Sequence, residues 1–149
     1  MIIITKENFN LEEEFEKINS LKNGAYSFFL GTVRQDIRDN IDGIFLECYE
    51  DLAIKQLNKI KEDSIKKWKL TDCAIIHRIG DLKISEKIVL VITAAPHRSD
   101  CIKACEYIID TLKANVAFWK FHIKGKEKEL VDQKKKDIDK YLSWSQVIS

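Results

Sequence analysis

The stretch Ile88-Val-Leu-Val-Ile-Thr-Ala-Ala-Pro-His97-Arg98 decides the fold. Its apolar and β-branched residues predict a buried strand over 87–95, which runs into a Pro-His-Arg loop. A helical pattern begins at once, near Ser99. A helix N-terminus offers unpaired N–H groups and the positive end of its dipole, so this corner of the fold is suited to hold an anion.

The composition of the chain is that of a globular protein. Its 149 residues, of which 45% are hydrophobic and 33% charged, are enough for one domain with a substantial core. The formal net charge of +1 gives no general attraction to nucleic acid or to anionic membranes, so anion binding has to come from local clusters. The first residues lack the basic lead of a signal peptide, and no run approaches the ~20 apolar residues of a membrane span. Four cysteines without C-x-x-C spacing favour reduced thiols and a cytoplasmic location.

Hydrophobic patterning predicts an α+β domain with a mixed or antiparallel sheet. Apolar runs and alternation predict about six strands, over 2–5, 25–33, 44–49, 73–80, 87–95 and 116–123. Amphipathic spacing predicts about three helices, over 10–19, over 51–69 and from 99 to 113. We expect a loop over 35–43 and a short connector over 81–85, and the charged tail over 125–149 shows no clear element.

Two residues predict local features of the backbone. Asn10 offers an N-cap oxygen with Glu13 three residues later, which is the spacing of a capping box. Gly31 interrupts the 25–33 strand and indicates a bulge or a close approach of another chain segment.

Basic side chains follow two of the predicted strands. Arg34 ends the first of them, and His97 and Arg98 end the second. An arginine supplies a permanent charge and a planar fork that fits phosphate, while a histidine adds a group that titrates near neutrality. The alternative is that His97 and Arg98 cap neighbouring carbonyls or form a surface pair. Local sequence does not separate these two interpretations.

Two lysines lie close together in the sequence near a turn. Lys113 ends a predicted helix and Lys120 lies in the next strand, so the turn between them can bring both ammonium groups together. Nearby cations and apolar surroundings lower a lysine pKa, and a lysine near neutrality can act as a base or a nucleophile. The simpler alternative is a helix-end lysine that favours the dipole and a strand lysine that snorkels. Phe118 and Trp119 could line a pocket for a flat ligand, or lie in the core and at an interface.

The other candidate groups favour structural interpretations. Cys101 and Cys105 share a helix face at i, i+4 and are predicted to be small core residues rather than metal ligands. His77 and His122 lack a partner at metal-binding spacing. The lysine run over 134–136 is predicted to be a solvated face.

Five motifs in series resemble one known family, the large, catalytic subunit of molybdopterin synthase. They cover roughly residues 24–120 in the order of the family and with about its spacing. The motifs are Gly31-Thr-Val-Arg34, Leu46-Glu-Cys-Tyr49, His77-Arg-Ile-Gly80, Pro96-His-Arg-Ser99 and Asp110-Thr-Leu-Lys113-Ala-Asn-Val-Ala-Phe-Trp-Lys120. The chain departs from the family pattern at Ala117, where a proline is common, and after Lys120, while Trp144 matches a late tryptophan of the family.

The resemblance implies a single α/β-hammerhead-type domain over 1–149 and a homodimer that binds two small ubiquitin-like sulfur-carrier subunits, as a heterotetramer. Each carrier ends in Gly-Gly with a C-terminal thiocarboxylate. The implied reaction is sulfur transfer from that thiocarboxylate to cyclic pyranopterin monophosphate, which forms the dithiolene of molybdopterin. It implies no metal and no cofactor, because the sulfur arrives on the carrier.

The resemblance also assigns residues. Lys113 matches the principal catalytic lysine of the family and Lys120 the second. Arg34, His97 and Arg98 match residues that bind the anionic groups of the substrate, and His97 and Arg98 are expected to act across the dimer interface. Two other functions remain as alternatives: a non-enzymatic module that binds a phosphorylated small molecule or an acidic peptide tail, and a thiol enzyme that uses a cysteine of the 99–113 helix.

Overall fold

Two four-stranded sheets form the framework of the protein. The structure is a computed structural model that describes residues 1–148. The first sheet has the strand order β1-β4-β6-β2, with β1 parallel to β4 and the other pairs antiparallel. Its strands are β1 (Ile2–Thr5), β2 (Ala25–Thr32), β4 (Asp72–Arg78) and β6 (Lys87–Ala95). The second sheet is antiparallel and has the order β5-β3-β7-β8. Its strands are β3 (Gly43–Cys48), β5 (Gly80–Lys83), β7 (Phe118–Lys124) and β8 (Glu127–Leu130).

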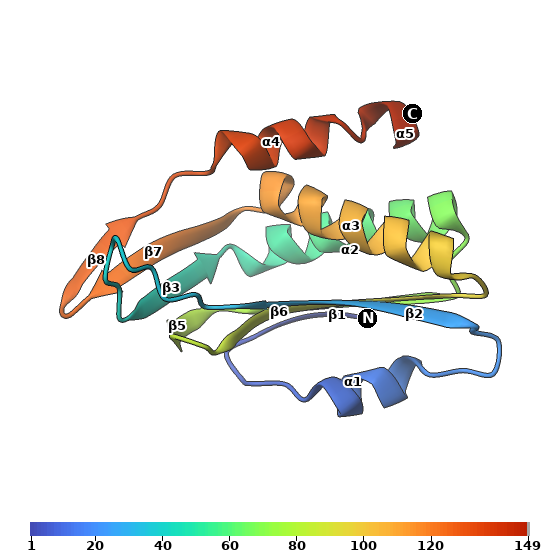
Figure 1. Cartoon of the computed structure of the whole chain (residues 1–149), viewed down its shortest axis with the longest axis horizontal. Helices are drawn as coiled ribbons and strands as arrows, with labels where there is room; N and C mark the ends of the chain where they lie inside the picture. The colour runs from blue at the N-terminus through green and yellow to red at the C-terminus, as the bar shows by residue number, and fades with distance from the viewer. Residues whose placement is uncertain (149) are drawn as a thin grey trace.

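Helices cover both faces of the first sheet. The short helix α1 (Leu11–Ile18) lies on one face, and α2 (Glu50–Trp68) and α3 (Arg98–Asn115) lie on the other (Figure 1). The chain then returns through β7 and β8, and α4 (Lys135–Leu142) lies over the outer side of α3 (Figure 1). The last helix is α5 (Ser145–Ile148). The layers place both ends of α3 at the surface, one beside β2 and one beside β7.

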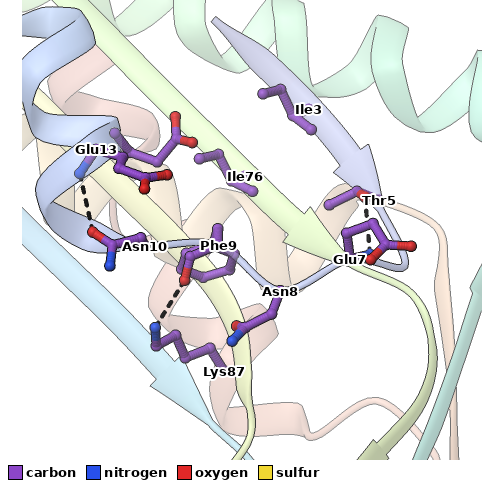
Figure 2. A pocket seen from close by; sticks show the side chains of 10 residues that line it. Ile3, Thr5, Glu7, Asn8, Phe9, Asn10, Glu13, Ile76 and Lys87 are labelled. Carbon is purple, nitrogen blue, oxygen red and sulfur yellow. Dashed lines mark hydrogen bonds between the residues drawn. The ribbon is translucent and has the colours of Figure 1, made fainter.

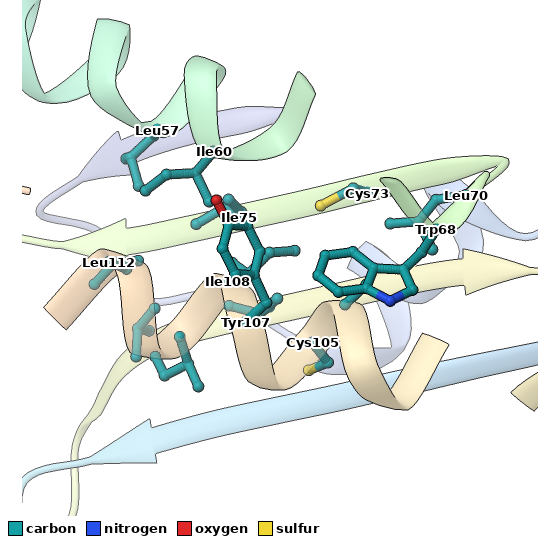
Figure 3. Packing of buried hydrophobic residues seen from close by; sticks show 14 of the residues in the cluster. Leu57, Ile60, Trp68, Leu70, Cys73, Ile75, Cys105, Tyr107, Ile108 and Leu112 are labelled. Atoms are coloured by element: carbon teal, nitrogen blue, oxygen red, sulfur yellow. The ribbon is translucent and has the colours of Figure 1, made fainter. Parts of the chain in front are cut away.

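The main core lies between the first sheet and the pair α2 and α3 (Figure 3). Leu57 of α2, Ile108 of α3 and Ile75 of β4 are fully buried there. Side chains of this kind stabilise the fold by about 1.5–3 kcal/mol each when fully buried. Strand β6 is buried from Val89 to Ala95 because helices pack on both of its faces, which explains its continuous apolar sequence.

Most of the elements predicted from the sequence are confirmed. Strand β6 has the predicted bounds, and the α+β class with a mixed arrangement of strands is as expected. The side chain of Asn10 accepts a hydrogen bond of 3.1 Å from the N–H of Glu13 and so caps α1. The register of β2 against β6 shifts between Gly31 and Thr32, which is the predicted irregularity.

Three expectations about the elements are wrong. The 81–85 connector contains most of β5, and the charged tail contains β8, so residues 1–148 form eight strands rather than six. The same residues form five helices rather than about three, because α4 and α5 follow β8. Strands β5 and β8 lie at the edges of their sheet and contain charged residues, so no apolar pattern marks them. Their pairing partners, β3 and β7, define them instead.

Candidate functional site

The C-terminal end of α3 and the strand β7 bring two lysines into one place. Lys113 lies exposed in the last turn of α3, and Lys120 lies half-buried on β7. Only Val116 and Ala117 separate the two elements, and the N–H of Val116 donates to the carbonyl of Leu112 to close the helix. The connection between the helix and the strand is therefore short, and it holds the two lysines near each other.

The environment of Lys120 is strongly cationic. Burial lowers the pKa of Lys120 first, and the charges of Lys134 and then Lys113 lower it further. Asp137 opposes this effect and Arg34 adds to it. A less basic ammonium is easier to deprotonate, so Lys120 is better able than an ordinary surface lysine to exchange a proton near neutral pH. The cluster as a whole can hold a phosphate-bearing ligand.

Three of the predicted site residues thus come together, namely Arg34, Lys113 and Lys120. The expected closeness of the lysine pair is present, and the lowered pKa is found at Lys120. The structure also adds a residue that the sequence reasoning missed. Lys134 is exposed, as predicted for a solvated face, and it is also the residue before α4, where its charge acts on Lys120. The sequence of three consecutive lysines does not indicate which of them lies near Lys120. Only the path of the C-terminal tail in the structure shows that it is Lys134.

His97 and Arg98 lie at the opposite end of α3. His97 precedes the helix without a side-chain cap, and Arg98 is its first residue. Both side chains are exposed, and they line a hollow of about 440 Å³ together with Gly24, Ala25, Pro96 and Ser99. The 18 residues of α3 span about 27 Å at 1.5 Å per residue. His97 and Arg98 therefore do not reach Lys113 within one chain.

The local arrangement at His97 and Arg98 fits an anion. Gly24 permits the close approach of the chain to Pro96, because a Cβ there would overlap the Pro96 carbonyl oxygen. Arg98 and Ser99, which line the hollow, are also the first residues of α3, and the first N–H groups of a helix have no partners inside it. Two basic side chains at a helix N-terminus supply charge and donors together. The side chain of His97 makes no hydrogen bond to the first N–H groups of the helix.

A second hollow, of about 410 Å³, lies between α1 and the first sheet (Figure 2). The residues that line it include the acidic Glu7, Glu13 and Glu14 and the apolar Ile3 and Ile76. The one lysine that lines it, Lys87, donates a hydrogen bond of 2.8 Å to the carbonyl of Phe9 (Figure 2). This hollow lacks the cations that a phosphate requires, so it is not a candidate for the predicted anion.

The cysteines are placed as core residues, as predicted for Cys101 and Cys105. These two side chains and Cys73 are buried, and burial raises the pKa of each thiol, for Cys73 to about 12. The Cys101 thiol donates to the carbonyl of Ala25. Since the thiolate is the nucleophile, such thiols are poor candidates for catalysis. Among residues 1–148, no cluster of three or more histidine, cysteine or acidic side chains is arranged for a metal ion.

The two aromatic residues before Lys120 have different surroundings. Phe118 stacks on the buried imidazole of His77, with ring centroids 3.8 Å apart, and packs against the main core, so one face of its ring is covered. Trp119 points the other way and is 48% exposed. The choice between a core position and a ligand-facing one is therefore settled for Phe118 in favour of the core.

Comparison with known proteins gives consistent results. The family model described as MoaE protein matches residues 4–115. The molybdopterin synthase catalytic subunit of Vibrio cholerae is 32% identical over 145 residues, which cover 96% of this chain and 97% of that protein. A molybdopterin biosynthesis MoaE protein from Burkholderia ambifaria has a similar structure, with a TM-score of 0.81, 34% identity and 96% of each chain covered. A complex of subunits 1 and 2 of molybdopterin-converting factor from Helicobacter pylori shares the fold, with a TM-score of 0.78, 22% identity and coverage of 89% of this chain and 91% of that one.

Proposed function

The chain belongs to the MoaE protein family, and on that premise we propose how it acts as the catalytic subunit of a molybdopterin synthase, a sulfurtransferase. The substrate is cyclic pyranopterin monophosphate, and the sulfur comes from the C-terminal thiocarboxylate of a small ubiquitin-like carrier. Two transfers convert the substrate into the dithiolene of molybdopterin. The observation that supports this assignment best is the cationic cluster around the half-buried Lys120.

Lys113 and Lys120 divide the chemistry of each transfer. Lys113, exposed at the end of α3, lies where an extended Gly-Gly tail can reach it from solvent. Once the sulfur is bonded to the substrate, water attacks the carbonyl carbon of the carrier, a C–O bond forms, the C–S bond breaks and the sulfur stays on the substrate. The ammonium of Lys113 stabilises the negative charge that develops on the carbonyl oxygen in this step. Lys120 holds the substrate and exchanges a proton with it, which its lowered pKa favours. Arg34 supplies a further positive charge beside them.

His97 and Arg98 complete the site of a neighbouring protomer. Within one chain the length of α3 separates them from Lys113, so a second copy has to bring its own pair to the lysines. A homodimer with two such composite sites binds one carrier at each, as a heterotetramer. The pair then contacts an anionic group of the substrate, since its two basic side chains flank the free N–H groups of α3.

The reaction requires no metal and no organic cofactor, because the carrier delivers the sulfur and no change of oxidation state needs a redox partner. The protein works in the cytoplasm, where its four cysteines remain as free thiols. Among the described residues, no helix is long and apolar enough to cross a membrane.

Reconstitution tests the proposal. The protein is mixed with a thiocarboxylated carrier and cyclic pyranopterin monophosphate, and the dithiolene product is measured. We expect product from the unaltered protein and a loss of at least about 100-fold in rate for Lys113→Ala. Near-normal turnover of Lys113→Ala would contradict the role of Lys113. A well-folded protein that gives no product would instead favour a non-enzymatic module that binds the phosphorylated substrate.

A further inference from the structure

Two glutamine side chains close the C-terminal end of α3. The last carbonyls of a helix have no partners inside it and need donors from elsewhere. Gln133 donates from its side-chain nitrogen to the carbonyls of Lys113 and Ala114, at 2.9 and 2.7 Å. Gln56 of α2 donates to the carbonyl of Asn115 at 2.9 Å. The helix end that carries Lys113 is therefore held by a residue of the C-terminal tail.

The same part of the tail is fixed to the other lysine. We call residues 131–134, between β8 and α4, the strap. At the start of the strap, the N–H of Val131 donates to the carbonyl of Lys120 at 2.8 Å. At its end, the charge of Lys134 acts on the ammonium of Lys120. Gln133 lies between these two points, so the strap contacts the backbone of both Lys113 and Lys120.

We propose that Gln133 is a positioning residue of the sulfur-transfer site, whose double hydrogen bond to the end of α3 fixes Lys113 relative to Lys120 and holds Lys134 beside them. This inference rests on the proposed function for its effect on turnover, although the geometry itself does not. Gln133 touches no reacting atom, since its amide is directed at the helix carbonyls.

Loss of the hydrogen bonds of Gln133 should change the positions of the lysines more than the stability of the fold. Gln133 is exposed, so water can satisfy the two carbonyls when the amide is removed. The strap is then free to move away from the helix end, and the spacing of the three lysines changes. A displacement of about 1 Å in a catalytic group can lower a rate by as much as 100-fold.

Two variants remove the hydrogen bonds. Gln133→Met keeps the length of the side chain without a donor or a charge, and Gln133→Ala removes the side chain as well. For both, we expect kcat of sulfur transfer to fall about tenfold while KM rises only about threefold, since Lys134 is displaced but the other binding groups remain. The control is Lys140→Ala. Lys140 lies on α4, and its replacement removes the ion pairs with Glu106 and Asp110 of α3. We expect this control to keep kcat within about twofold.

A second measurement does not depend on activity. Lys120 is labelled with an amine reagent over a range of pH, and the pH of half-maximal labelling is read by mass spectrometry of its peptide. This value follows the pKa of the amine rather than its maximal rate of labelling. The charged groups that act on Lys120 are Lys134, Lys113 and Arg34, which lower its pKa, and Asp137, which raises it. If the strap moves away, the half-labelling pH is expected to rise in both Gln133 variants and to stay unchanged in Lys140→Ala.

Each outcome decides the inference. Wild-type kcat or a wild-type half-labelling pH in Gln133→Met overturns it, and so does an equal change in Lys140→Ala, because a loosened tail alone would then explain the result. If the unaltered protein gives no dithiolene product, the proposed function fails, and the labelling result then decides the geometric role of Gln133 by itself. Circular dichroism and the thermal midpoint show that each variant is folded before it is compared.

Discussion

The ring of Phe118 lies flat on the buried imidazole of His77, with centroids 3.8 Å apart and an angle of 11° between the planes. Phe118 is two residues before Lys120 on β7, while His77 belongs to β4 of the other sheet. The contact therefore joins strand β7, which carries Lys120, to the first sheet. Burial lowers the pKa of His77 to about 4, so the ring is neutral at pH 7 and its Nδ1–H donates to the Arg78 carbonyl at 2.8 Å.

The neutral state of His77 predicts a loss of stability in acid. An ordinary histidine has a pKa of 6.5, whereas His77 in the folded protein has a pKa of about 4. Between these values the unfolded chain binds a proton and the folded chain does not, so this contribution is complete above pH 6.5 and is lost as the pH falls. The loss at pH 5 is about 2 kcal/mol.

Urea unfolding at pH 7.5 and pH 5 measures this loss. The variant His77→Phe keeps an aromatic ring against Phe118 and removes the titrating group, at the expense of the hydrogen bond to Arg78. We expect the fall in unfolding free energy between the two pH values to be about 2 kcal/mol smaller in this variant than in the unaltered protein. An identical fall in both proteins would show that other groups cause the acid sensitivity.

A close approach at Gly24 predicts a second effect on stability. A methyl group at this position would overlap the carbonyl oxygen of Pro96, immediately before His97. Gly24→Ala is expected to destabilise the protein by about 1–3 kcal/mol, because the backbone has to move. It should also weaken substrate binding through the displaced His97 loop. The control is Leu21→Ala in the same connection, whose side chain is fully exposed and whose loss should be nearly neutral. Equal unfolding free energies for Gly24→Ala and the unaltered protein would contradict the predicted overlap.

The elements predicted correctly from the sequence are those whose apolar pattern is local. Strand β6 is continuous in its hydrophobicity, and the Asn10 cap and the Gly31 irregularity follow from the chemistry of single residues. The closeness of Lys113 and Lys120 could also be predicted, since the end of the helix and the start of the strand are only two residues apart.

The C-terminal tail could not be predicted in this way. Helix α4 has few apolar residues, and its place follows from contacts of the tail with α3 that are remote in sequence, such as the hydrogen bond of Trp144 to Asp110. The roles of Gln133 and Lys134 depend on that placement. The separation of His97 from the lysines follows from the length of α3, and the sequence indicates which residues act across a dimer only through the family resemblance.

The buried thiols predict that sulfur transfer needs no cysteine of this chain. Cys101→Ser and Cys105→Ser replace thiols whose pKa burial raises. We expect each variant to keep kcat within about twofold, and to lose about 1 kcal/mol of stability because a hydroxyl replaces a thiol in the core. Rates of dithiolene formation and urea unfolding measure the two effects. Loss of turnover in a folded variant would instead support the thiol enzyme.

Lys134 is predicted to affect both substrate binding and the pKa of Lys120. Lys134→Ala removes the largest charge effect on Lys120, so the pKa of Lys120 should rise towards its ordinary value. We expect KM for cyclic pyranopterin monophosphate to rise about three- to tenfold, because a cation of the phosphate-binding cluster is lost. The pH dependence of amine labelling at Lys120 reports the first effect. Lys136→Ala removes an exposed charge of the same run and should change neither quantity. Equal effects of both variants would assign the result to net charge alone.

Trp144 anchors the tail to the core and so determines whether the strap stays in place. Its ring packs edge-on against Trp68 and Tyr107, and its Nε1–H donates to a carboxylate oxygen of Asp110 at 2.8 Å. Trp144→Ala removes both contacts and is expected to lower the unfolding free energy by about 2–3 kcal/mol. Trp144→Phe keeps much of the packing and loses the hydrogen bond, at about 1 kcal/mol.

The rate of trypsin cleavage in the tail distinguishes an anchoring role of Trp144 from a general effect on stability. If Trp144 holds the tail, Trp144→Ala should expose the lysine run over 134–136 to trypsin, and cleavage there should be at least about tenfold faster than in the unaltered protein. Leu142→Ala, a truncation of a 55% exposed side chain in the same segment, should leave the rate of cleavage unchanged. Trypsin resistance in Trp144→Ala would mean that β8 and Gln133 hold the strap without the tryptophan. In that case the contacts near Lys113 and Lys120 hold the tail in place, and the packing of Trp144 depends on those contacts rather than maintaining them.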